Sequence, residues 1–183
     1  MHKAIFLDRD GVINKDHAYV HQIADFEFID GVFDACKQFV QAGYKIVVVT
    51  NQSGIGRGYY DEAQFHLLSD WMCAQFMARG IEITGVYFCP HHPEKANAPY
   101  NVECSCRKPE PGMLHQAIAE HNLDPAQSIM VGDKVSDIQA AHAAGLATTV
   151  LVESGQRFTD TQKQLADYVC KSLGSVPQAL SIL

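Results

Sequence analysis

Short apolar runs alternate with segments of helical periodicity along most of the chain. The apolar runs are typical of buried strands and cover residues 4–7, 45–49, 83–88, 128–131 and 147–152. Apolar residues spaced three and four apart predict helices over residues 31–42, 61–79, 111–121 and 135–144. This alternation is typical of βαβ units, so we expect an α/β fold with a mainly parallel sheet.

Two long segments lack either period. Residues 15–30 are polar and aromatic, and we expect a loop over the edge of the sheet. Residues 89–109 hold several prolines and three cysteines, and a loop of that length in a compact domain is usually functional or held by a metal. After residue 152 the pattern weakens and predicts a helix over 161–165, a short strand at 168–169 and a terminal helix over 176–183.

Length and composition indicate one domain spanning residues 1–183, expected to be a monomer. The chain contains no run of about 18 apolar residues, the length needed to span a bilayer. The first predicted strand begins too early to leave room for a signal peptide. We therefore expect a cytoplasmic protein. The net charge of −7 argues against nucleic acid or a membrane as a partner, because binding phosphate backbones needs a basic surface. A small phosphorylated ligand stays compatible with that charge if a metal ion is present.

Polar side chains follow three of the predicted strands at their carboxyl ends. Asp8 and Asp10 follow the first strand, two residues apart and therefore on one face. Thr50 follows the second strand, and Asp133 and Asp137 follow the fourth. Ligands bind at the carboxyl edge of an open parallel sheet. We therefore expect these side chains to converge there.

The converging carboxylates alone would repel a phosphate and one another. A hard divalent cation removes both problems, and oxygen ligands favour Mg²⁺. Asp8 then becomes a candidate nucleophile toward phosphorus, and Asp10 a candidate general acid and base. Thr50 and backbone N–H groups could hold the phosphoryl oxygens. Lys108, from the loop before the third helix, would neutralise charge in the transition state.

Each feature also has a purely structural explanation when taken alone. The first two carboxylates could be a charged turn after a buried strand, and Thr50 could belong to a plain strand-to-loop turn. The two later carboxylates could cap the next helix, and Lys108 could be a solvated side chain. Their ordered combination at successive strand ends favours a phosphate-handling site instead.

The ordered motifs resemble the haloacid dehalogenase (HAD) superfamily of phosphotransferases. They are D-R-D-G-V at residues 8–12, T-N at 50–51, K-P at 108–109 and G-D-K-V-S-D at 132–137. The motifs cover most of the chain, and Val12 stands where the family has a non-catalytic threonine. The resemblance implies a Rossmann-like three-layer sandwich. Members usually carry a cap domain after strand one or three, but here both connections look like loops, so we expect no cap.

The resemblance also implies a role for each matched residue. Asp8 would be the nucleophile, Asp10 the general acid and base, and Thr50 and Lys108 would stabilise the transferring phosphoryl group. Asp137 would contact the residues that bind the metal without binding the metal itself. The ligands of Mg²⁺ would come from three positions: Asp8, the backbone carbonyl of Asp10, and Asp133.

The loop 89–106 carries a second set of candidate metal ligands. Cys89, His91, Cys104 and Cys106 form a Cys₃His set, which is a closed structural zinc site if it is tetrahedral. The spacing is tighter than in a common zinc knuckle, and His92 competes with His91 as the fourth ligand. Unbound thiols and surface histidines are the alternative. A metal joining both ends of one long loop would offset the loop's entropy, which favours zinc.

Further motifs narrow the resemblance to the capless, zinc-loop phosphatases, which include sugar-bisphosphate phosphatases and histidinol-phosphate phosphatases. These motifs are D-H-A-Y-V, T-N-Q-S-G-I-G-R-G and C-S-C-R-K-P. They imply a phosphorylated sugar as substrate, with histidinol phosphate as the alternative. Arg107 favours a bisphosphate, because its planar fork binds phosphate through two hydrogen bonds. The implied substrate contacts are Asp16, His17, Ala18, Tyr19, Thr50, Asn51, Gln52, Ser53, Arg107 and Lys108.

Two other functional classes fit less well. A zinc-stabilised binding module with a vestigial site would be expected to lack at least one of Asp8, Asp10, Lys108 or Asp133, and all four are present. A polynucleotide 3′-phosphatase would need a basic stripe, which the net charge of −7 argues against.

Overall fold

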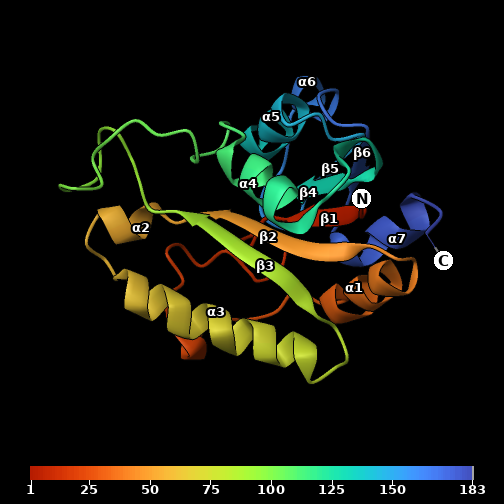
Figure 1. Ribbon diagram of the computed structural model, residues 1–183, viewed down its shortest axis with the longest axis horizontal. Coiled ribbons are helices and arrows are strands. Elements are labelled where there is room, and N and C mark those ends of the chain that lie inside the picture. Colours follow the sequence, from red (N-terminus) through yellow and green to blue (C-terminus); the bar gives the residue numbers. More distant parts are fainter. Residues whose placement is uncertain (183) are drawn as a thin grey trace.

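Six parallel strands form the central layer of the computed structural model, which describes residues 1–182. They are β1 (Ala4–Leu7), β2 (Lys45–Asn51), β3 (Ile83–Cys89), β4 (Ile129–Gly132), β5 (Thr148–Val152) and β6 (Tyr168–Cys170). Their order across the sheet is β3-β2-β1-β4-β5-β6 (Figure 1). The order reverses at β1, so the carboxyl ends of β1, β2 and β4 lie side by side. This is the position where open α/β sheets bind ligands.

Helices cover both faces of the sheet, which gives three layers (Figure 1). On one face lie α1 (Val32–Gln41), α3 (Glu62–Met77) and α7 (Val176–Ala179); on the other lie α4 (Gly112–His121) and α5 (Val135–Ala143). The shorter elements are α2 (Ser53–Gly56), α6 (Asp160–Lys163) and the 3₁₀ turns η1 (Ile23–Asp25), η2 (Pro125–Gln127) and η3 (Leu173–Ser175). The predicted three-layer α/β fold with a parallel sheet is confirmed.

The core lies in two parts, one on each face of the sheet. Along β1, Ile5 and Leu7 pack into the cluster beneath α1 and α3, while Ala4 and Phe6 pack into the cluster beneath α4 and α5. All four side chains are fully buried. Alternation along the strand therefore supplies both core clusters, and the apolar run is continuous because neither face of β1 meets water.

The strand boundaries differ from the predictions at the site edge. We expected β2 to end at residue 49, but its pairing with β3 continues through Thr50 and Asn51. The polar identity of these two residues hides the extension, because the apolar run stops before them. The single turn α2 was not predicted, since its sequence S-G-I-G contains two glycines, which are poor helix formers.

The helix ends follow ordinary capping rules. The Asp61 side chain accepts a hydrogen bond from the backbone N–H of Gln64, and Gln64 Oε1 accepts one from the backbone N–H of Asp61, which forms a capping box at the start of α3. Pro111 is the N-cap of α4, so this helix begins at Gly112, one residue later than predicted. The predicted terminal helix is the single turn α7, and the Leu183 part of that prediction lies outside the described residues.

Loops alone make the two connections in which related proteins carry caps. Residues 8–31 hold only the turn η1, and residues 90–111 contain no helix or strand in the described chain. The second connection lies beyond the carboxyl end of β3, next to α2 (Figure 1). The expectation of a capless site covered by loops agrees with this arrangement. Within residues 1–182, no helix is both long enough and apolar enough to cross a membrane.

Candidate active site

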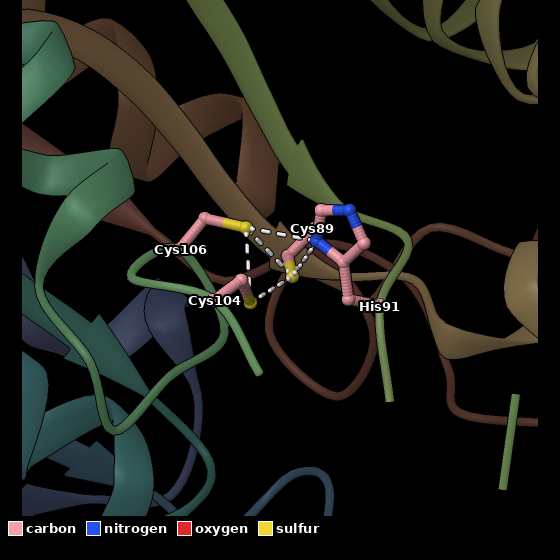
Figure 2. Close-up of side chains that lie close together, drawn as sticks. All are labelled: Cys89, His91, Cys104 and Cys106. Atoms are coloured by element: carbon pink, nitrogen blue, oxygen red, sulfur yellow. Dashed lines mark hydrogen bonds between the residues drawn. The ribbon is translucent and has the colours of Figure 1, made fainter. Parts of the chain in front are cut away.

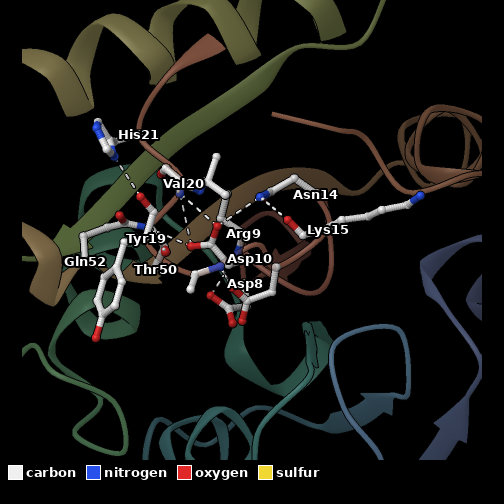
Figure 3. A network of polar contacts seen from close by, with 12 residues as sticks. Asp8, Arg9, Asp10, Asn14, Lys15, Tyr19, Val20, His21, Thr50 and Gln52 are labelled. Carbon is white, nitrogen blue, oxygen red and sulfur yellow. Dashed lines mark hydrogen bonds and ion pairs between the residues drawn. The ribbon is translucent and has the colours of Figure 1, made fainter. Parts of the chain in front are cut away.

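Four of the predicted site residues meet at the carboxyl edge of the sheet. Asp8 directly follows β1, Thr50 is the last residue but one of β2, and Asp133 directly follows β4. Lys108 reaches the same place from the loop before α4. All four side chains are buried, and Figure 3 shows Asp8, Asp10 and Thr50 side by side. The sheet topology therefore brings together residues that are far apart in sequence.

Lys108 is held between two carboxylates. Its Nζ lies 3.1 Å from Asp8 Oδ1 and 2.7 Å from Asp137 Oδ1, and it donates a hydrogen bond of 2.7 Å to the carbonyl of Val49. Its main chain is fixed as well. The Lys108 N–H donates to Asn51 Oδ1 at 3.0 Å, and Asn51 Nδ2 donates to the Lys108 carbonyl at 3.2 Å. The position of the ammonium group is thus set at both ends of the residue.

These contacts decide the charge of Asp8 and Lys108. Burial opposes ionisation of Asp8, but the positive charge of Lys108, the hydrogen bonds from Asp133 and Lys108 and the charge of Lys134 together outweigh it and lower the pKa of the carboxyl group. Burial likewise disfavours the ammonium form, but the charges of Asp137 and Asp8 outweigh it and raise the pKa of Lys108. Asp8 is therefore a carboxylate and Lys108 an ammonium at neutral pH, as a nucleophile and its electrostatic partner need to be.

A metal ion fits the acidic cluster of Asp8, Asp133 and Asp137. One oxygen from each residue lies within 4.8 Å of the others, and all three residues are buried. Asp133 Oδ1 is buried without a hydrogen-bond partner. Burial first, and then the charges of Asp8 and Asp137, raise the pKa of Asp133 to about 10. A hard cation would satisfy the orphaned oxygen and keep this carboxylate ionised.

Asp137 is occupied by other contacts. Its Oδ2 accepts hydrogen bonds from the backbone N–H groups of Asp133 and Lys134, each at 3.1 Å, and its Oδ1 contacts Lys108. Burial and the charge of Asp8 raise the pKa of Asp137 to about 6. The side chain fixes the turn that presents Asp133 and orients Lys108.

The segment after β5 also holds the acidic cluster in place, and we did not expect it from the sequence. A Cβ on Gly155 would lie 2.0 Å from Asp133 Oδ2, and a Cβ on Gly11 would lie 2.1 Å from the same atom. Gln156 Nε2 donates to the Asp133 carbonyl at 2.7 Å, and Ser154 Oγ donates to the Gly11 carbonyl at 2.6 Å. The only sequence signal for this role is that S-G-Q, residues 154–156, follows the end of a predicted strand.

Asp10 is fixed by a separate polar network (Figure 3). Arg9 Nη2 donates to both of its oxygens, at 2.9 and 3.1 Å, and to the carbonyl of Val20 at 2.7 Å. Asn14 Nδ2 donates to Asp10 Oδ1 at 3.0 Å. Gln52 Nε2 donates to Asp10 Oδ2 at 3.1 Å. The network aims the carboxyl group at the cavity and ties it to the loop that carries Val20.

Tyr60 extends this network and was likewise not expected. Its hydroxyl donates to Gln52 Oε1, which sets the Gln52 amide so that Nε2 faces Asp10 and Thr50. The Thr50 hydroxyl accepts from that amide at 2.8 Å. The ring of Tyr60 stacks on His21 with centroids 4.8 Å apart. Its place eight residues after Gln52 gives no sequence signal of this contact.

A cavity of about 590 Å³ opens above these groups. Most of the expected substrate contacts line it, namely Asp16, Ala18, Tyr19, Asn51, Gln52, Ser53, Arg107 and Lys108. His17 lines a neighbouring cavity instead, and Thr50 is buried beneath the wall. Further lining residues that we did not expect include Arg57, Tyr60, Lys134 and Ser136.

A recess of about 30 Å³ lies next to Asp8 and shares part of this lining. Its wall is formed by Asp8, Asp10, Asn51, Lys108, Lys134, Ser136 and Asp137, and five of these residues also line the large cavity. The recess is therefore the place where a group entering through the cavity would meet Asp8.

The loop over the cavity has a strained backbone. Ala18 and Tyr19 are consecutive residues with φ of 61° and 56°, a region that residues other than glycine rarely occupy. The ring of Tyr19 packs edge-on against Tyr59 with centroids 4.8 Å apart, and the guanidinium of Arg57 lies 5.5 Å from its centre. Strain of this kind persists where surrounding contacts fix the conformation, and it clusters at ligand-binding sites.

Cys89, His91, Cys104 and Cys106 form a compact cluster outside this cavity (Figure 2). The Sγ of Cys106 lies 2.9 Å from that of Cys89 and 3.4 Å from that of Cys104, and Cys89 and Cys104 are 3.6 Å apart. His91 Nδ1 lies 3.6 Å from Cys89 Sγ and 3.4 Å from Cys106 Sγ. Apart from the shorter Cys106–Cys89 distance, these spacings are close to those between ligands of one tetrahedral zinc ion.

The structure distinguishes the two adjacent histidines. The Nδ1 of His91 faces the three sulfur atoms. The Nδ1 of His92 instead accepts hydrogen bonds from the backbone N–H groups of Glu94 and Lys95, at 3.2 and 3.0 Å. The side chain of His92 thus stabilises a turn, and His91 is the residue placed to bind a metal.

Comparison with known proteins assigns the chain to a family. The family model described as HAD-hydrolase-like matches residues 105–176. A relative from Yersinia pestis described as D-glycero-β-D-manno-heptose-1,7-bisphosphate 7-phosphatase is 52% identical over 177 residues, covering 97% of this chain and 94% of the relative. A relative of the same description from Escherichia coli K12 is 51% identical over 177 residues, covering 97% and 93%. The chain belongs to the D-glycero-β-D-manno-heptose-1,7-bisphosphate 7-phosphatase family.

The structure of this heptose bisphosphate phosphatase family member agrees with a solved relative. The D,D-heptose 1,7-bisphosphate phosphatase from B. bronchiseptica, complexed with magnesium and phosphate, superposes with a TM-score of 0.85. It is 35% identical, and the match covers 98% of each chain.

The family assignment confirms the predicted HAD resemblance and makes the protein a phosphoric monoester hydrolase. The motifs in the sequence resemble this heptose bisphosphate phosphatase family in particular. The alternative drawn from them, a histidinol-phosphate phosphatase, is not what these relatives are. The predicted roles of individual site residues stay predictions.

Proposed function

We propose that the protein removes the 7-phosphate of D-glycero-β-D-manno-heptose 1,7-bisphosphate and releases heptose 1-phosphate and inorganic phosphate. The observation that supports this most is the ionised Asp8 carboxylate, held against Lys108 in a recess below a cavity that Arg107 lines. We infer a place in ADP-heptose synthesis, which supplies lipopolysaccharide and related glycans.

Asp8 is the nucleophile in this proposal. Its carboxylate oxygen forms a bond to the phosphorus of the 7-phosphate as the bond from phosphorus to the C7 oxygen breaks. The resulting aspartyl phosphate is then attacked by water, which forms inorganic phosphate and regenerates the Asp8 carboxylate. The lowered pKa of Asp8 supports this role, because only the ionised form attacks.

Asp10 transfers the protons in both halves of the reaction. It gives a proton to the departing C7 oxygen, and it then takes a proton from the attacking water. The hydrogen bonds from Arg9, Asn14 and Gln52 support this role, since they fix the carboxyl group at the wall that the cavity and the recess share.

Lys108 and Thr50 stabilise the phosphoryl group during transfer. The Lys108 ammonium contacts Asp8 and lines the recess, so its charge falls beside the equatorial phosphoryl oxygens. Thr50, with nearby backbone N–H groups, supplies neutral hydrogen bonds from the floor of the site. The hydroxyl of Thr50 accepts from Gln52 at 2.8 Å and donates to the Asn51 carbonyl over a long 3.4 Å contact, which a phosphoryl oxygen would replace.

We assign the catalytic Mg²⁺ to Asp8, the backbone carbonyl of Asp10 and Asp133, with Asp137 in support. The ion would supply positive charge that withdraws electrons from the phosphoryl oxygens. The unpartnered Asp133 Oδ1 and the raised pKa of that carboxyl group both fit a cation at this place. Gly11 and Gly155 leave room for Asp133 to point into the cluster.

The zinc ion of this proposal is structural. Cys89, His91, Cys104 and Cys106 use all four tetrahedral positions, so no position stays open for substrate. The loop depends on the metal for its shape, because residues 90–111 have no helix or strand of their own. Arg107 and Lys108 follow Cys106 directly, and the metal would therefore fix the two cations that face the substrate.

The substrate is held by the loop residues that line the cavity. Asp16, Ala18 and Tyr19 approach it from one side, and Asn51 and Ser53 approach it from the end of β2. His17 belongs to the same loop but lines the neighbouring cavity, so we assign it to substrate binding through the backbone of the loop. Preference for the β-anomer follows the description of the relatives.

We place the enzyme in the cytoplasm as a monomer. The reducing conditions there keep cysteines as thiols, the form that the zinc site requires. The six cysteines are unpaired in the described chain, in agreement with that setting.

A direct comparison of substrates tests the proposed function. The values of kcat/KM for heptose 1,7-bisphosphate and histidinol phosphate are measured side by side, with Mg²⁺ present. We expect the bisphosphate to be preferred by at least about tenfold, equivalent to about 1.4 kcal/mol of transition-state binding. Equal values, or a preference for histidinol phosphate, would refute the assignment of the substrate.

A further inference from the structure

Arg57 is a cation without a carboxylate partner at the wall of the large cavity. It follows α2 directly, and its side chain is half-buried. Its Nε is buried without a hydrogen-bond partner, and no ion pair in residues 1–182 includes it. Its guanidinium lies over the ring of Tyr19, 5.5 Å from the ring centre. A half-buried guanidinium with an unused donor is a candidate for binding an anion.

The position of Arg57 separates it from the chemistry at Asp8. Both Arg57 and Arg107 line the large cavity, but neither lines the small recess beside Asp8. A phosphoryl group in that recess meets Lys108 and Lys134 instead. The two arginines therefore face the part of a substrate that is not being transferred.

The cysteine-containing loop fixes both arginines from behind. The Arg107 N–H donates to Cys104 Sγ at 3.4 Å, and its Nη1 donates to the carbonyl of His91 at 3.5 Å. On the other side, Asn97 donates through its backbone N–H to the carbonyl of Gly56 at 2.7 Å and through Nδ2 to the carbonyl of Arg57 at 3.4 Å. One loop thus sets the position of two guanidinium groups that are 50 residues apart in sequence.

This loop is packed closely against α2. A Cβ on Gly56 would lie 2.5 Å from the carbonyl oxygen of Pro90 and 2.7 Å from the Cβ of Ala96. Only glycine permits that approach. The backbone just before Arg57, in the segment G-R-G, is therefore in direct contact with the loop. The position of Arg57 is therefore built into the contact between the two segments.

We propose that Arg57 binds the phosphate that stays on the sugar and acts with Arg107 as a pair of guanidinium groups selective for bisphosphates. This inference rests on the proposed function and extends it to Arg57, a residue to which the resemblance gives no role. Two planar guanidinium groups suit a dianionic phosphate, since each can donate two hydrogen bonds. A monophosphate would leave Arg57 without its anion, so its contribution appears only when the second phosphate is present.

The test compares two substrates that differ only in that phosphate, heptose 1,7-bisphosphate and heptose 7-phosphate. We measure kcat/KM for both with the wild type, Arg57→Gln and Arg57→Lys. In Arg57→Gln the ratio of the two values falls by about 10- to 100-fold, the size of one or two charge-assisted hydrogen bonds. Arg57→Lys, which keeps the charge, restores part of the ratio. Arg79→Gln serves as a matched control, because Arg79 lies over Phe33 away from the cavity.

The outcomes separate this inference from the proposed function. A wild type that does not hydrolyse the bisphosphate refutes both. A wild type that does, with an unchanged ratio in Arg57→Gln, refutes the role of Arg57 alone. An equal loss on both substrates would show that Arg57 supports only the structure of the cavity, and it would overturn the inference as well.

Discussion

The ammonium of Lys108 lies 3.1 Å from the carboxylate of Asp8, although the two residues are 100 positions apart in sequence. The parallel sheet places Asp8 at the end of β1, and Asn51 at the end of β2 holds the main chain of Lys108 beside it. The contact opposes the effect of burial and helps to lower the pKa of Asp8. It also explains why the loop that carries Lys108 must have a fixed shape.

Replacement of Lys108 by methionine tests this contact. Lys108→Met leaves buried carboxylates without their cation, so we expect a loss of about 3–5 kcal/mol in the free energy of unfolding. Urea denaturation without Mg²⁺ measures it. Added Mg²⁺ should restore part of the stability but not the turnover. A variant as stable as the wild type would contradict the account of the pair.

Asp8→Asn removes the nucleophile while keeping its size. We expect turnover to fall by at least about 10³-fold, because the amide oxygen cannot form the phosphorus bond. Circular dichroism checks that the fold is kept. Substantial residual turnover would refute the covalent mechanism.

Asp10→Asn removes the proton donor without removing the nucleophile. We expect a severe loss with heptose bisphosphate, about 10²- to 10⁴-fold in kcat, since the sugar oxygen must be protonated as it leaves. The loss should be smaller with p-nitrophenyl phosphate, whose leaving group is stable as an anion. Near-normal turnover of the sugar substrate would exclude the acid–base role.

The fold was largely predictable because each strand combines an apolar run with a polar end. The run of Ala4 to Leu7 marks β1, and its continuous apolarity indicates burial on both faces. The errors fall at the site, where β2 continues through polar Thr50 and Asn51 and where the glycine-rich α2 forms. Function places polar residues and glycines at these positions, and both obscure the periodicity.

The candidate site was predictable only where chemistry leaves a local motif. Asp8 and Asp133 occur in short motifs at strand ends and Lys108 in the K-P motif before α4, and the structure brings them together. Tyr60 and Gly155 act through contacts with residues distant in sequence. No spacing or composition marks such residues, because their positions follow from the packed loops.

Replacement of Gly155, which packs against Asp133 but is not a proposed metal ligand, tests the acidic cluster. A Cβ there would lie 2.0 Å from Asp133 Oδ2 and must displace that carboxylate. We expect Gly155→Ala to raise the Mg²⁺ concentration for half-maximal activity by about tenfold, equivalent to about 1.4 kcal/mol of binding free energy. Titration of activity with Mg²⁺ measures the change. An unaltered Mg²⁺ dependence would show that Asp133 is not a ligand.

Zinc removal tests the cysteine cluster. Purified protein should contain about one zinc ion per chain, and Cys104→Ser should lose it. Hydrogen exchange should then accelerate across residues 89–106 while the strands stay protected. KM for the bisphosphate should rise more than kcat falls, because Arg107 and Lys108 lose their support. Metal analysis of the wild type without zinc would rule out the clamp.

The position at which the substrate is cleaved tests the central claim most directly. Heptose 1,7-bisphosphate of the β-anomer is incubated with enzyme and Mg²⁺ and followed by ³¹P NMR. The account predicts that the 7-phosphate signal is replaced by that of inorganic phosphate while the 1-phosphate signal persists. Loss of the 1-phosphate signal, or no change in either signal, would contradict it.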